Sequence, residues 1–141
     1  MIMFESTRII VLSGLLLSSV GAAAPGGCLI ADQTAGTRVV ADNQVYTITG
    51  GTALGGNLLH SFLEFNVESG EIAAFQAGAQ TQQIISRVTG DNNSWINGTI
   101  RIDGESQADL YLVNPNGLIF GPEASLDVPG ALYASTADYV A

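Results

Sequence analysis

Two groups of residues in the sequence have the chemical types needed for hydrolysis. His60 and Ser61 are a base and a nucleophile, and Glu64, Glu68 and Glu71 are carboxylates of the kind that bind calcium or form a glycosidase pair. A catalytic triad needs the nucleophile beside the base in space, and an acid that orients the base. Adjacent residues of a strand point to opposite faces of the sheet. The sequence therefore predicts a structural, hydrogen-bonded histidine and solvated carboxylates at strand edges.

The composition argues against several other kinds of site. Cys28 is the single cysteine and His60 the single histidine, which leaves no material for an internal disulfide or a zinc site. The formal net charge is -9, and all four cationic side chains are arginines, spread along the chain. A nucleic-acid binder needs clustered cations to displace counterions from phosphates. The sequence thus predicts a protein that is not an enzyme, has no cofactor or metal, and does not bind nucleic acid.

Residues 1–24 have the features of a secretory signal peptide. Arg8 precedes an apolar run over residues 9–17, and the small residues 21–24 offer a cleavage site. The run is shorter than the roughly 20 apolar residues that span a bilayer. The alternative is a strand or helix buried at the N-terminus. Lipid attachment at Cys28 is disfavoured, because Pro-Gly-Gly precedes it in place of a leucine-like residue. We expect export through the inner membrane and a mature domain over residues 25–141.

The mature part alternates between apolar and other residues with a period of two, and glycines interrupt the pattern. Short strands of this kind fit either the coils of a solenoid or a β-sandwich. A coil of about 20 residues cannot stand alone, because each buried side chain contributes about 1.5–3 kcal/mol while ordering each residue costs about 1–2 kcal/mol. The pattern favours a stacked solenoid. Strands are expected over residues 38–40, 45–48, 62–67, 71–75, 99–103, 109–112, 118–120, 125–128 and 131–134.

Three ordered blocks of residues, over 50–67, 85–100 and 114–138, carry a family resemblance. Their motif residues are Asn57, His60, Ser61 and Phe62 in the first block, Arg87 and Gly90 in the second, and Asn114, Pro115, Asn116 and Gly117 in the third. Together they resemble the filamentous haemagglutinin N-terminal domain, also called the haemagglutination activity or two-partner secretion domain. The resemblance runs from about Ile30 to Ala141.

The resemblance implies an all-β fold, a right-handed parallel β-helix (solenoid) with an N-terminal cap and extra strands. It also implies export by the general secretory route, transit of the periplasm, and passage through a partner β-barrel of the outer membrane. The periplasmic POTRA domains of that transporter recognise such domains, and the family has no catalytic role. In the family the β-helix continues beyond the block that ends at Asp138, so the resemblance implies a domain truncated at the C-terminus, whose last strand has nothing stacked on it.

Two departures from the family pattern stand out. An Asn-Pro-Asn-Leu block is expected upstream, but residues 90–94 read Gly-Asp-Asn-Asn-Ser, and Leu118 replaces the usual isoleucine. The turn at Asn114 to Gly117 has two interpretations, as a structural turn between coils or as a motif that the secretion partner recognises.

Two functions stay open at this point. The first is a secretion-targeting module of a large exported adhesin-like protein, which the transporter recognises and which nucleates folding of the β-helix. The second is an adhesin module that binds host or cell-surface glycans. Both predict a secreted or cell-surface location.

Overall fold

The computed structural model describes residues 2–5, 8–11 and 28–137. Most of the expected signal peptide lies outside these ranges, so its removal stays a prediction. The described residues form strands and turns, without a helix. The strands are β1 (Ile2–Glu5), β2 (Arg8–Val11), β3 (Leu29–Ala31), β4 (Thr37–Asp42), β5 (Val45–Gly50), β6 (Thr52–Leu54), β7 (Asn57–Phe65), β8 (Ile72–Gln76), β9 (Gln83–Val88), β10 (Ser94–Ile96), β11 (Thr99–Asp103), β12 (Asp109–Val113), β13 (Leu118–Phe120), β14 (Ser125–Asp127) and β15 (Ala131–Ser135).

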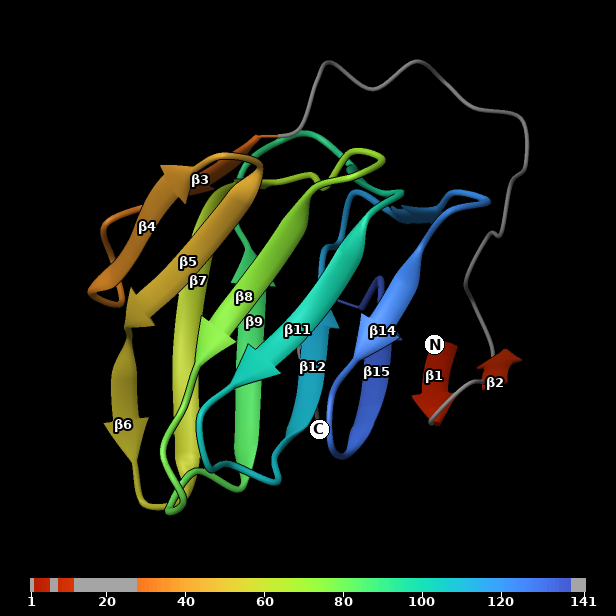
Figure 1. The fold of residues 1–141 in the computed structure, drawn as a ribbon. Helices are drawn as coiled ribbons and strands as arrows, with labels where there is room; N and C mark the ends of the chain where they lie inside the picture. Colours follow the sequence, from red (N-terminus) through yellow and green to blue (C-terminus); the bar gives the residue numbers. More distant parts are fainter. Residues whose placement is uncertain (1, 6–7, 12–27, 138–141) are drawn as a thin grey trace.

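The strands stack as a β-solenoid of about 4 turns, as the sequence predicts. Strands β5, β8, β11 and β14 form one parallel stack, and β7, β9, β12 and β15 form the stack behind it (Figure 1). A third, smaller sheet pairs β10 with β13, and Val67 extends it by a bridge to Ile96. The register pairs Val45 with Ile72 and Ile72 with Thr99, so each of these coils takes about 27 residues.

Antiparallel strands flank the first coil. Strand β4 pairs with β5, while β3 and β6 both pair with β7. These are additional to the parallel stacks, as the resemblance implies. At the other end, β1 pairs antiparallel with β15, and β2 pairs with β1. The last strand thus has a neighbour in this structure, whereas the expectation of an uncovered last strand concerns the mature chain over residues 25–141 and stays a prediction. Both added strands belong to the expected signal peptide, and its removal would uncover the β15 edge.

Inward side chains from the stacked sheets fill the core. One column runs through Ile84, Leu110 and Leu132, which occupy matching positions in successive coils. The first two coils hold an aromatic cluster: the ring of Phe62 packs edge-on against Phe65 at 5.1 Å between centroids, and the Phe65 ring is stacked with Phe75 at 6.2 Å. Parallel pairing thus places like residues above one another, and the core lies between the stacked sheets.

The sequence predicts clean alternation over residues 62–67, and the structure departs from it. Phe62, Phe65 and Val67 are all buried, while Leu63 between them is exposed. The register against β3 shifts between Ile30 and Ala31, which is an irregularity of the β-bulge type. Strand β7 also begins earlier than expected, at Asn57, and ends at Phe65.

Candidate recognition turn and the corner that supports it

Asn114 lies at a corner of the third coil and is completely buried, with 0% of its surface exposed. Its side-chain amide donates to the Asn92 carbonyl at 3.0 Å and to the Ser94 hydroxyl at 2.9 Å, both in the second coil. Its backbone N–H donates to the carbonyl of Ser135 in the fourth coil at 3.0 Å. Buried polar groups need such partners, because leaving one unpaired costs about 1–3 kcal/mol. Asn114 therefore ties together three successive coils.

The same asparagine shapes the turn that follows it. The Asn114 carboxamide oxygen accepts from the backbone N–H of Asn116, and its carbonyl accepts from Gly117 N–H, each at 3.0 Å. Proline suits the second position of such a turn because its φ is fixed near -65°. Gly117 has φ of 120°, a conformation that favours glycine. The sequence of the turn thus follows from its backbone geometry.

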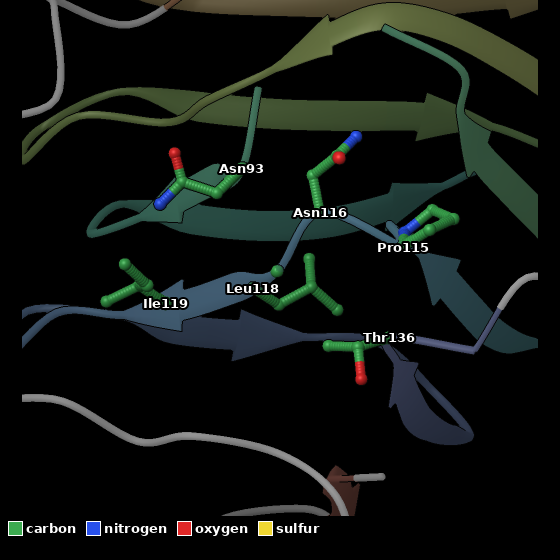
Figure 2. A pocket seen from close by; sticks show the side chains of 7 residues that line it. Asn93, Pro115, Asn116, Leu118, Ile119 and Thr136 are labelled. Carbon is green, nitrogen blue, oxygen red and sulfur yellow. The ribbon is translucent and has the colours of Figure 1, made fainter. Parts of the chain in front are cut away.

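The outer surface of the turn is accessible. Pro115 and Asn116 are exposed. A shallow hollow of about 330 Å³ lies beside them, and Figure 2 shows the side chains around it. The residues that line it are Asn93, Pro115, Asn116, Gly117, Leu118, Ile119 and Thr136. The Asn114 side chain therefore makes structural contacts, whereas Pro115 and Asn116 lie at the surface of the turn.

The structure brings Gly90, one of the two motif residues of the second block, to this turn. The side-chain amide of Asn116 donates to the carbonyl of Gly90 at 2.7 Å. A Cβ on Gly90 would lie 2.1 Å from the Leu63 carbonyl oxygen, so only glycine fits there. Residues 90–94 stand where the Asn-Pro-Asn-Leu block was expected. They accept the hydrogen bonds that support the Asn114–Gly117 turn, and are called its shelf below.

The residues of the first block and Arg87 lie away from the turn. Asn57 starts β7, where it pairs with Gln83, and Phe62 is part of the aromatic cluster. His60 is buried beside Phe75, with 5.6 Å between ring centroids, and its Nδ1 lies 3.1 Å from the Thr37 hydroxyl. Ser61 lies on the opposite face of the strand and hydrogen-bonds to the Asp32 carboxylate at 2.5 Å. Arg87 is exposed, and its Nη2 lies 3.4 Å from the Ser61 hydroxyl. Ser61 therefore does not present its hydroxyl to His60, as the alternation of side chains along the strand predicts.

Comparison with family models matches residues 28–141 to the TPS secretion domain, where TPS stands for two-partner secretion. The match covers most of the chain. This chain belongs to the TPS secretion domain family. A search of curated proteins finds no significant match to it. The resemblance drawn from the three blocks is confirmed, and with it a role in two-partner secretion.

Corner residues of the TPS domain repeat one kind of contact that the sequence did not reveal. The side-chain oxygens of Asn66, Asn97 and Asp109 each accept a backbone N–H from the following coil, at 2.8 Å in all three cases. Each bond spans between 22 and 29 residues. Asn66 and Asn97 each come directly after a strand and Asp109 begins one, so a polar residue at a strand end was the available signal, but its partner depends on coil length.

Two of the three glutamates that were expected at strand edges, Glu64 and Glu71, have hydrogen-bond partners within the TPS domain. Glu71 is half-buried and accepts from the Tyr46 hydroxyl at 3.0 Å and from the Glu68 N–H at 2.8 Å, so it is more than a solvated strand edge. Glu64 accepts from the Asn92 side chain at 2.5 Å. Among the described residues, no group of three or more His, Cys, Asp or Glu side chains is placed to hold a metal. No helix in the described part of the chain has the length and apolar character needed to cross a membrane.

Burial of His60 makes the stability of the TPS domain depend on pH. Desolvation lowers the pKa of His60 to about 4, because its surroundings are Thr37, Phe62, Phe75 and the inward Ser86. An unfolded histidine has a pKa of about 6.5. At a pH between these two pKa values, His60 binds a proton in the unfolded chain but not in the folded one. The free energy of unfolding should therefore fall as the pH drops from about 6.5 to about 4, by up to about 3 kcal/mol.

Urea unfolding of the wild type and of His60→Gln across this pH window measures the effect. Glutamine cannot acquire the charge, so its unfolding free energy should change much less with pH between 4 and 6.5. Equal pH slopes for the two proteins would show that His60 is not the group responsible.

Proposed function

We propose that this chain is the targeting module of a large exported protein, and that the POTRA domains of an outer-membrane TPS transporter recognise it in the periplasm. Removal of the leader over residues 1–24 and transit of the periplasm belong to the same proposal. The observation that carries it is the family match over residues 28–141, on a chain that folds as a solenoid. The module is a binding and folding element without catalysis of its own.

The stacked architecture supports a second part of the proposal, that the first coils nucleate folding of the rest. Each coil covers the apolar residues of the coil before it, as the column Ile84, Leu110 and Leu132 illustrates. Burying each such side chain contributes about 1.5–3 kcal/mol. Folding outside the outer membrane, where no nucleotide is supplied, then biases the chain toward the outside.

Expression of the full chain in a bacterial host, with and without its TPS transporter, tests the function. The chain should be found in the medium only when the transporter is present, and in the periplasm when the transporter is absent. A transporter that lacks its periplasmic POTRA domains is the matched control and should behave as no transporter. Equal amounts in the medium under all three conditions would rule out the proposed role.

A further inference from the structure

A hydrogen-bonded cluster around Asp32 lies outside the recognition turn and has no part in the proposed function so far. Asp32 follows β3, in the segment that leads to β4. Its Oδ1 accepts from the N–H and the hydroxyl of Thr34, at 2.9 and 2.7 Å, which fixes the local turn. Its Oδ2 accepts from the hydroxyls of Ser61 at 2.5 Å and Thr89 at 2.6 Å. One carboxylate thus holds four donors.

The two long-range donors come from different coils. Ser61 lies on β7 in the first coil, 29 residues along the chain from Asp32, and Thr89 follows β9 in the second coil, 57 residues away. Strand β3 pairs with β7 of the first coil, and backbone hydrogen bonds join Cys28 to Asn66 and Asp32 to Ser61 beside it. The Thr89 N–H donates to the Phe62 carbonyl at 2.8 Å, so Thr89 reaches its place only when the second coil is stacked on the first.

The carboxylate is well suited to act as an acceptor here. Burial alone would raise the pKa of Asp32, but the hydrogen bonds from Ser61, Thr89 and Thr34 outweigh it and hold the pKa well below the usual range. The group is therefore ionised at neutral pH, and hydrogen bonds to a charged acceptor are worth more than those between neutral groups.

We infer that Asp32 is a clasp that locks the segment 28–36 onto the solenoid once the second coil has stacked on the first and Thr89 has joined the donors from Thr34 and Ser61. Before that, the segment is held by the first coil alone, through the β3–β7 pairing and the backbone hydrogen bonds of Cys28 and Asp32. In a partly folded chain the β3 segment therefore opens more readily and uncovers the edge of β7. The consequence for export, that a transporter meets this open segment before release, rests on the proposed function, whereas the clasp itself does not.

Unfolding and refolding kinetics of the full chain, without any transporter, test the clasp. A contact that forms after the transition state changes the unfolding rate and leaves the refolding rate unaltered. Asp32→Ala should therefore unfold about tenfold faster and refold within about twofold of the wild-type rate. Asp42→Ala removes an exposed carboxylate at the end of β4, and should change neither rate by more than about twofold.

Thr89→Val supplies a milder variant that removes the hydrogen bond from the second coil to Asp32, together with the longer bond of 3.3 Å from the same hydroxyl to the Phe62 carbonyl. Amide exchange of residues 29–31 should become faster in Thr89→Val, although residue 89 belongs to another coil. Unchanged exchange of residues 29–31 in this variant would overturn the inference. So would a refolding rate of Asp32→Ala that falls as much as its stability does, because the clasp would then form before the coils stack.

Discussion

Replacing Asn114 with alanine is expected to lower the free energy of unfolding by about 3 kcal/mol. Export through the transporter should fall together with this stability. The side chain is completely buried and bonded to Asn92, Ser94 and Asn116. Alanine would leave the Asn92 carbonyl, the Ser94 hydroxyl and the Asn116 N–H without these partners, in a corner that joins three coils. Urea unfolding measures the first effect, and the amount of chain in the medium measures the second.

Pro115→Ala is the matched control at the same turn. Pro115 is exposed, and alanine can adopt its backbone angles, so stability should change by no more than about 1 kcal/mol. If the turn acts through the fold, this variant is exported normally while Asn114→Ala is not. Loss of export in Pro115→Ala with stability unchanged would show instead that the transporter reads the surface of the turn directly.

Replacing Phe75 with alanine is expected to have the largest effect on stability, a loss of about 3–5 kcal/mol. Phe75 has 0% of its surface exposed, and its ring lies between His60, Phe62 and Phe65 at centroid distances of 5.6, 6.4 and 6.2 Å. It is the residue of β8 that completes the aromatic cluster shared by the first two coils. Truncation leaves a cavity that the surrounding strands cannot close.

Chemical denaturation of Phe75→Ala and Leu63→Ala gives the comparison. Leu63 is 45% exposed, so its truncation should cost less than about 1 kcal/mol. A cost for Phe75→Ala similar to that for Leu63→Ala would mean that the first two coils are not held together through this cluster.

The sequence predicted the strands whose inward positions are uniformly apolar. Ile100 and Ile102 of β11, and Leu110 and Leu112 of β12, alternate as expected and are buried. The sequence did not predict β9 and β10, which alternate in the same way but have a buried serine at an inward position. In β9 the inward Ser86 interrupts the alternation between Ile84 and Val88, and β10 starts with the buried Ser94. Strand β6 is exposed throughout and leaves no burial pattern to detect.

The candidate site was only partly predictable, because its contacts join different coils. The Asn114–Gly117 turn could be found from its residue types, since asparagine, proline and glycine each suit one turn position. Its shelf at Gly90 and Ser94 and the Asp32 clasp could not, because the pairing of residues 20 to 57 positions apart depends on coil length and register. The alternation of apolar residues within a single strand specifies neither the coil length nor the register between coils.

Recognition of the partly folded chain is tested most directly by its binding to the isolated POTRA domains of its TPS transporter, followed during refolding. The chain is diluted from denaturant into the POTRA domains at increasing delays, and the bound fraction is measured at each delay. Binding is expected to be strong at short delays and to decline as the solenoid forms. No binding at any delay, or binding only to the fully folded chain, would contradict this expectation.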